Sequence, residues 1–272
     1  MIALLEPPRA TPEPNNDRLE ELVKTVSASR LNLWNNCRLK FYFRYVLQIS
    51  KPKTAALFVG SLVHAILQSW SMARWKKEPF DLEKYKAQFD EQWKDQQAKA
   101  RIDWEGEEDK ERAGAWNAIE CYFKQTPITQ DEKPEAVEVS VEADLEKHGL
   151  PKLIGVLDLV REGGRIVDFK TCGQTPHPEM VKHTNLLQLS CYAVLYRECT
   201  GHLEGGLEIH SIVKTKTPKI IITELPPMTN QQQTRLFKII ESYQAGIYRE
   251  DFVPAAGFTC AGCEYLKECR AW

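Results

Sequence analysis

The chain has 272 residues, of which 43% are hydrophobic and 27% are charged, and seven are tryptophan. This composition excludes a disordered chain, and the length is sufficient for one large folded domain. The formal net charge of −2 excludes a globally basic surface, so any contact with nucleic acid has to come from local basic patches.

Neither a run of about 18 apolar residues nor a signal-peptide pattern is present in the sequence. We therefore expect a cytoplasmic protein that does not associate with a membrane. The chain contains eight cysteines. In a reducing compartment, clustered cysteines indicate metal binding rather than disulfides.

The N-terminal part of the chain is expected to begin with a flexible segment. Residues 1–25 contain four prolines and many polar groups, which favours a lead-in to a single domain over 26–272. Ser29 is the expected N-cap of a first helix that continues to Tyr45.

The first half of the domain is expected to be mainly helical. A helix over 57–75 places Gly60, His64 and Gln68 along one stripe at four-residue spacing. Residues 81–126 are charged, with aromatic residues at helical spacing, and we expect a helical insertion there.

The second half begins with strands. In residues 137–142, valines alternate with polar residues, which predicts a strand whose other face carries Glu138 and Glu142. The further elements expected, in chain order, are a hairpin over 153–170, a helix over 183–199, strands over 206–214 and 218–224, a helix over 228–247 and a cysteine-bearing tail over 257–272. This order predicts an α/β fold with a mixed central sheet.

The expected hairpin carries charged residues where apolar ones are usual. The two-residue period of a strand places Asp168 and Lys170 on one face and Phe169 on the other. A three-residue loop over 162–164 sets Asp158 opposite Asp168, whereas a two-residue turn puts Asp158 on the Phe169 face. Because two consecutive glycines allow positive φ, we expect the longer loop or a bulge.

Two carboxylates and a lysine on one strand face point to metal-dependent chemistry. Carboxylates hold Mg²⁺ or Mn²⁺, and a neighbouring lysine suits a phosphodiesterase. The alternative is an exposed hairpin in which Asp168 and Lys170 form a cross-strand ion pair without catalytic function.

The tail contains the second strong signal. Cys260, Cys263 and Cys269 are close enough in sequence to converge on one metal centre, and Cys37 is the expected fourth ligand. The residues alone leave an iron–sulphur cluster, a zinc ion and reduced buried thiols open. The remaining cysteines are expected to be buried bystanders: Cys121, Cys172, Cys191 and Cys199.

Taken together, these segments resemble the PD-(D/E)XK nuclease superfamily, and within it the RecB-like branch with a four-cysteine iron–sulphur cluster. That branch includes the AddB nuclease domain and CRISPR-associated exonucleases. The matching segments, in order, are Ser29-Arg-Leu with Cys37 and Phe41-Tyr-Phe-Arg-Tyr45, Gly60-Ser-Leu-Val-His64, Gly155-Val-Leu-Asp158, Asp168-Phe-Lys170-Thr171, Gln188-Leu-Ser-Cys-Tyr192 and the cysteines of the tail. Arg38 stands where the family usually has a proline.

The resemblance implies a restriction-endonuclease-like core and a metal-dependent DNA exonuclease acting on single strands or DNA ends. It further implies a role in recombination, repair or CRISPR-type spacer processing. The implied site consists of catalytic His64, Asp158, Asp168 and Lys170; Mg²⁺ or Mn²⁺ held by His64, Asp158, Asp168 and the Phe169 carbonyl; Gln188 and Tyr192 behind the site or on the DNA; and a 4Fe–4S cluster on Cys37, Cys260, Cys263 and Cys269.

The implied partners are DNA and a helicase or integrase protein. Two local basic groups are expected to contact phosphates, one around the first helix and one near residue 216: Arg38, Lys40, Arg44, Lys51 and Lys53, and Lys214, Lys216 and Lys219. Trp34, Tyr42 and Tyr45 are expected to stack on unpaired bases. The alternative function is a catalytically silent nuclease-like scaffold that binds DNA or a partner.

Overall fold

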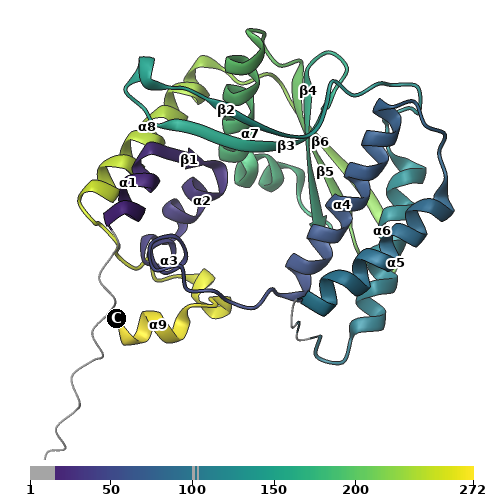
Figure 1. Ribbon diagram of the computed structural model, residues 1–272, viewed down its shortest axis with the longest axis horizontal. Coiled ribbons are helices and arrows are strands. Elements are labelled where there is room, and N and C mark those ends of the chain that lie inside the picture. Colours follow the sequence, from purple (N-terminus) through teal and green to yellow (C-terminus); the bar gives the residue numbers. More distant parts are fainter. Residues whose placement is uncertain (1–15, 100–101, 103) are drawn as a thin grey trace, which may run out of the picture. The chain divides into compact units, whose positions relative to one another are not determined.

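The computed structural model describes residues 16–99, 102 and 104–272 (Figure 1). These residues form two compact units. The first unit comprises the described part of residues 1–51 together with 144–153 and 235–272, and the second comprises the described parts of 52–143 together with 154–234. The single domain expected over 26–272 stays a prediction.

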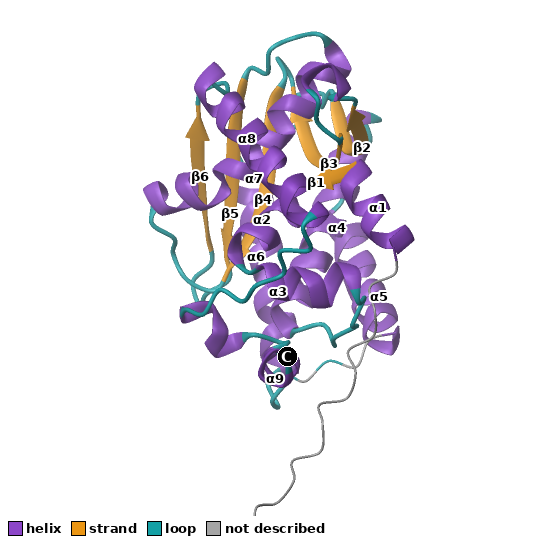
Figure 2. Ribbon diagram, turned by 90° about the vertical axis from the view of Figure 1, so that its left-hand side faces the viewer, coloured by secondary structure: helices purple, strands orange, loops and turns teal. Residues whose placement is uncertain are grey.

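A mixed sheet forms the centre of the second unit. Its strands are β2 (Ala136–Ala143), β3 (Lys152–Arg161), β4 (Arg165–Cys172), β5 (Gly206–Val213) and β6 (Lys219–Leu225). β3, β4, β5 and β6 are neighbours in that order, and β2 also pairs with β3. β4 and β5 are parallel, whereas β3–β4 and β5–β6 are antiparallel (Figure 2). The mixed sheet predicted from the sequence is therefore confirmed.

Helices cover both faces of this sheet. α7 (Pro178–Thr200) links the parallel strands β4 and β5, as such strands require a crossover. α4 (Ala55–Trp75) and α6 (Glu108–Gln125) lie on the opposite face of the sheet from α7, and α5 (Leu82–Lys99) packs against α4 (Figure 1). Within the segment 81–126, where a helical insertion was expected, the described residues form the helices α5 and α6.

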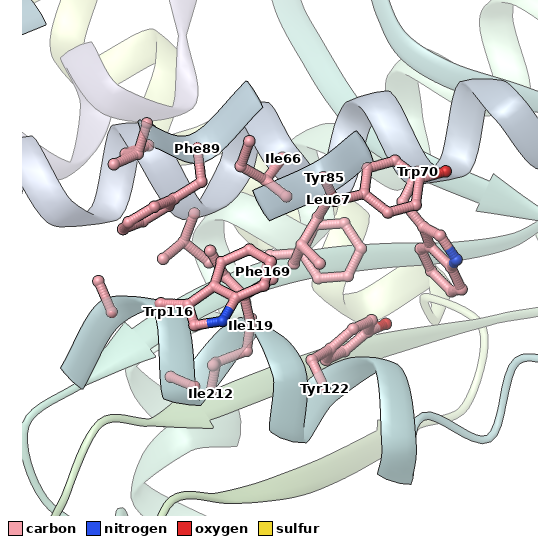
Figure 3. Close-up of a cluster of buried hydrophobic side chains, with 14 of the residues drawn as sticks. Ile66, Leu67, Trp70, Tyr85, Phe89, Trp116, Ile119, Tyr122, Phe169 and Ile212 are labelled. Atoms are coloured by element: carbon pink, nitrogen blue, oxygen red, sulfur yellow. The ribbon is translucent and has the colours of Figure 1, made fainter. Parts of the chain in front are cut away.

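The apolar core of the second unit lies between β4 and these three helices. Figure 3 shows Phe169 of β4 among side chains of α4, α5 and α6, including Trp70, Phe89 and Tyr122. α4 is the one described helix long and apolar enough to cross a membrane. Much of its apolar surface is buried in this core, which explains its composition without a membrane.

The start of the first unit differs from expectation. Residues 16–24, expected to belong to a flexible lead-in, form α1 (Asn16–Lys24); residues 1–15 lie outside the described part of the chain. The helix is held because Leu22 and Val23 are buried and Tyr243 donates a hydrogen bond of 2.9 Å to the Leu22 carbonyl. A short strand, β1 (Thr25–Ser27), follows.

The first expected helix begins earlier and is interrupted. Ser27, not Ser29, is the N-cap of α2 (Ala28–Asn36), because its extended backbone lets the side chain accept from the Arg30 amide. At Cys37 the backbone is extended, which ends α2, and Cys37 then caps α3 (Arg38–Phe41) before a π-helix over Tyr42–Val46. The first unit closes with α8 (Asn230–Tyr248), which begins in the second unit, and α9 (Leu266–Ala271).

A buried ion network ties three strands of the second unit together. Glu208 of β5 accepts hydrogen bonds of 3.0 Å from Arg161 of β3 and from Arg165 of β4. His210 lies 2.8 Å from the same carboxylate. Burial by itself raises the pKa of Glu208, but His210 and the two arginines outweigh it and lower that pKa to about 2.

This network predicts that Glu208 stabilises the fold in a pH-dependent way. Its pKa is lowered from 4.5 in the folded protein, so its contribution is complete above pH 4.5 and is lost as the pH falls toward 2. By linkage we expect Glu208→Gln to lower the free energy of unfolding at pH 7 by about 3 kcal/mol, with the difference from wild type vanishing near pH 2.

Urea unfolding between pH 7 and pH 2.5 measures this difference. The matched control is Glu224→Gln, because Glu224 is exposed and lies 3.8 Å from Arg165; we expect it to change stability little. Equal effects of the two variants at pH 7 would contradict the prediction.

Candidate active site

The hairpin of β3 and β4 has the register that the expected site requires. Arg161 pairs with Arg165, and the three residues between them form the loop, with φ of +78° at Gly163 and +71° at Gly164. The three-residue loop is therefore confirmed. Paired residue numbers in this register sum to a constant, so Asp158 falls opposite Asp168.

The carboxylate of Asp158 bonds to the backbone of β4. The Phe169 amide donates a hydrogen bond of 3.0 Å to Asp158 Oδ2. A side chain of β3 thereby satisfies a backbone group of β4 beside Asp168. This contact joins the two strands that carry the expected carboxylates.

Asp168 is the most buried charged group of the site, with 1% of the residue exposed. Gln188 donates a hydrogen bond of 2.8 Å to Asp168 Oδ1. The Lys170 ammonium forms an ion pair with Asp168, with 2.8 Å between Nζ and Oδ2. Apart from Lys170, Oδ2 has no partner among the described residues.

The electrostatic setting of Asp168 reflects this burial. Burial raises the Asp168 pKa to about 6, and the negative charge of Asp158 adds to the rise, while Lys170 and His64 oppose it. Holding both carboxylates ionised is therefore unfavourable without a further positive charge. A divalent cation would supply that charge.

His64 approaches the carboxylates from α4. Its Nδ1 lies 3.5 Å from Asp158 Oδ2, and its ring stands edge-on to Phe169 with centroids 6.0 Å apart. Burial lowers the pKa of His64, but Asp158 outweighs burial and the net pKa is raised. The structure thus brings His64, Asp158, Asp168 and Lys170 to one place.

Gln188 links the charged pair to α7. Its Oε1 accepts a hydrogen bond of 3.0 Å from Lys170, and its Nε2 donates to Asp168 Oδ1 and, at 2.6 Å, to the Tyr192 hydroxyl. One amide side chain therefore holds both the lysine and the carboxylate. Gln188 and Tyr192 lie one helical turn apart, which places them on the same face of α7.

Glu138 of β2 also lies in the field of this site. Burial and the negative charge of Asp158 raise the Glu138 pKa, and the positive charge of His64 opposes the rise. Its backbone has a φ of +44°, unusual for a residue with a side chain. The alternation of valines and polar residues predicted the same role for Glu138 and Glu142, because such a pattern does not reveal a positive φ at one position.

Two buried polar residues near Phe169, Glu208 and His210, were not predicted from the sequence. Glu208 and His210 share one face of β5, and both are buried. The sequence feature that could have indicated them is the presence of two polar residues at alternate positions of an otherwise apolar strand. Buried polar residues of this kind usually form hydrogen bonds with one another.

The donors at this site fit a hard divalent cation. Two carboxylates and one imidazole suit Mg²⁺ or Mn²⁺, and Asp168 Oδ2, whose partner among the described residues is Lys170, is the oxygen that would turn to the cation. As the side chains stand, the described residues contain no group of three or more acidic, histidine or cysteine side chains already arranged to hold a metal ion. Asp168 would therefore exchange its Lys170 ion pair for the cation.

The four cysteines expected to bind a cluster all belong to the first unit. All are free thiols. Burial raises the pKa of Cys269, and the negative charges of Cys37, Cys263 and Cys260 add to the rise, so each of the three lies within electrostatic reach of Cys269.

Four residues of the two expected basic groups form ion pairs with carboxylates. Ion pairs join Arg38 to Asp251, Lys40 to Glu264, Lys51 to Glu268 and Lys214 to Glu111. Trp34 and Tyr42 are buried against other aromatic rings. The expectation that these two side chains stack on bases is wrong, because helix α2 directs Trp34 into the core of the first unit.

The chain was compared with protein families, curated proteins and solved structures. A family model described as the PD-(D/E)XK nuclease superfamily matches residues 25–270. A candidate exonuclease from Eubacterium rectale has a similar crystal structure, with a TM-score of 0.57 and 16% identity over 96% of this chain and 92% of that one. The structure of SSO0001 gives a TM-score of 0.38 and 11% identity over 89% of this chain and 95% of that one. None of the curated proteins compared with the chain matches it.

The buried carboxylate predicts opposite effects of one substitution on metal binding and on stability. We expect Asp168→Asn to weaken Mn²⁺ binding at least about 10-fold, because a ligand charge is lost. The same variant should unfold at a higher temperature than wild type in the absence of metal, because a buried charge is removed.

Isothermal titration with Mn²⁺ and thermal unfolding measure the two effects. Glu162→Gln is the matched control, because Glu162 is an exposed carboxylate in the loop of the same hairpin. Unchanged Mn²⁺ affinity in Asp168→Asn would contradict the assignment of Asp168 as a ligand.

Proposed function

Because the chain belongs to the PD-(D/E)XK nuclease superfamily, we propose that it is a metal-dependent deoxyribonuclease, most specifically an exonuclease on single-stranded DNA or DNA ends. Membership makes the protein a nuclease-type hydrolase with DNA as its substrate class. Its mixed sheet with helices on both faces agrees with a restriction-endonuclease-like core. The observation that carries the proposal is the meeting of Asp158 of β3 with Asp168 and Lys170 of β4.

Asp158, Asp168 and His64 are proposed to hold Mg²⁺ or Mn²⁺, with the Phe169 carbonyl as a further oxygen. Such a cation supplies a more acidic water and neutralises negative charge on the phosphate. The Phe169 amide fixes Asp158 at 3.0 Å, and Gln188 fixes Asp168 at 2.8 Å. Both carboxylates are thus held by hydrogen bonds before substrate binds, which lowers the reorganisation that the reaction requires.

Lys170 is proposed to act on the attacking water and on the phosphate. Hydrolysis forms a bond between the water oxygen and phosphorus and breaks one bond from phosphorus to a sugar oxygen, which receives a proton. The ammonium of Lys170, oriented by Gln188 at 3.0 Å, is placed to orient the water and to stabilise negative charge in the transition state.

Two similarities favour the exonuclease mode. It rests on the sequence resemblance to RecB-like exonucleases, and the Eubacterium rectale neighbour is itself described as a candidate exonuclease. Recombination, repair or CRISPR-type spacer processing is the proposed setting, in the cytoplasm, with a helicase or integrase as protein partner.

A 4Fe–4S cluster is the proposed second cofactor, on Cys37, Cys260, Cys263 and Cys269. Its support is the influence of Cys37, Cys263 and Cys260 on the pKa of Cys269, together with the free state of all four thiols. Four thiolates drawn from both ends of the chain would bind iron as Cys₄ clusters do. The cluster would then join α3 to the C-terminal tail within the first unit.

The proposed chemistry predicts that Lys170→Ala abolishes cutting without unfolding the protein. We expect loss of about 10³-fold or more in kcat on end-labelled single-stranded DNA with Mn²⁺, because transition-state charge loses its stabilisation. Lys182→Ala is the matched control, since Lys182 lies on the surface of α7 in an exposed ion pair with Glu179.

Linear and circular single-stranded DNA separate the modes of cutting. Shortening of linear DNA with circles intact supports an exonuclease, and cutting of circles would contradict that mode. Wild-type protein that binds DNA and cuts neither form would favour the catalytically silent scaffold.

The proposed cluster predicts iron and acid-labile sulphide in anaerobically purified protein. We expect Cys37→Ala to lose both, with the broad visible absorption of the cluster. Cys199→Ser is the control, because Cys199 is an exposed cysteine of α7 outside the set. Zinc without sulphide in the wild type would replace the cluster by a zinc site.

A further inference from the structure

The buried rings of Tyr122, Phe169 and His210 pack together on the face of β4 that points away from Asp168 and Lys170. We call these three rings the stack. The Phe169 ring is flanked by Tyr122 of α6 and His210 of β5, with ring centroids 5.6 Å and 5.8 Å away, both edge-on. Tyr122 belongs to the same apolar cluster as Phe169 (Figure 3). These rings fill the space into which Phe169 would otherwise move.

The stack is locked by a chain of hydrogen bonds. The Tyr122 hydroxyl lies 2.7 Å from His210 Nδ1, and His210 Nε2 lies 2.8 Å from Glu208 Oε2. A carboxylate accepts only, so a neutral His210 donates from Nε2 and Tyr122 donates to Nδ1. Burial lowers the pKa of His210, which agrees with a neutral ring.

The rings of the stack meet the site at the Phe169 ring, which contacts His64 at a centroid distance of 6.0 Å. The Phe169 backbone lies between Asp168 and Lys170, and its amide donates a hydrogen bond to Asp158. A shift of this side chain would therefore move the His64 imidazole and the backbone amide that holds Asp158.

We propose that Tyr122 and His210 are positioning residues of the nuclease site, which fix the Phe169 ring and through it His64 and Asp158. This inference rests on the proposed metal-dependent function. It assigns a catalytic consequence to a polar network that would otherwise serve stability alone.

Tyr122→Phe tests the inference because it keeps the ring and removes the hydroxyl that locks His210. We expect kcat to fall about 10-fold with KM for DNA unchanged, and Mn²⁺ binding to weaken by about the same factor, as for other groups that orient metal ligands. The imidazole ¹⁵N shifts of His64, measured by NMR without metal, should also move.

Tyr85→Phe is the matched control. Tyr85 is equally buried in the same cluster and packs on Phe80 and Phe123 rather than on Phe169. We expect it to leave kcat, Mn²⁺ affinity and the His64 shifts at wild-type values, even where it lowers the melting temperature.

A Tyr122→Phe protein that is less stable but has wild-type kcat, Mn²⁺ affinity and His64 shifts would show that the stack is structural only, and would overturn the proposal. Should this variant fail to fold, His210→Gln decides by the same criteria, because its amide can accept from Tyr122 and donate to Glu208 without a ring against Phe169. A wild type that neither binds Mn²⁺ nor cuts DNA would instead overturn the proposed function itself.

Discussion

Strand β4 is covered by helices on both faces, and this burial is the constraint on which the candidate site depends. A charge on such a strand cannot be solvated by water and has to be met by other groups of the protein. Asp168 is met by Gln188 and Lys170, and Asp158 is met by the Phe169 amide. The contacts that satisfy these charges also fix the geometry that metal-dependent hydrolysis needs.

The two faces of the sheet have different tasks in this arrangement. On the α7 side, hydrogen bonds from Gln188 orient the charged groups. On the α4 and α6 side, ring packing around Phe169 and the network of Tyr122, His210 and Glu208 hold the strand from behind. One residue, Phe169, joins the two sides, since its backbone belongs to the first and its ring to the second. Stability and proposed activity are therefore coupled through a single position.

Burial also explains why the described side chains are not already arranged to coordinate a metal ion. Asp168 forms an ion pair with Lys170, so a lysine stands in for part of the positive charge that a cation would bring. The raised pKa of Asp168 reflects burial that this lysine offsets only in part. Such incomplete compensation is typical of functional sites, where stability is given up for reactivity.

The sequence by itself determined the α/β class, the mixed sheet and the three-residue hairpin loop that brings Asp158 to the face of Asp168 and Lys170, because strand alternation and glycine pairs act locally. Gln188 was indicated only by the resemblance to a nuclease family. Tertiary structure decided what depends on distant contacts. The burial of Trp34 follows from packing within the first unit, and the influence of Asp158 and His64 on Glu138 follows from the approach of other elements to β2. The stack joins Tyr122 of α6, Phe169 of β4 and His210 of β5, and Tyr122 and His210 are 88 residues apart in sequence. No local pattern specifies which helix will supply the tyrosine.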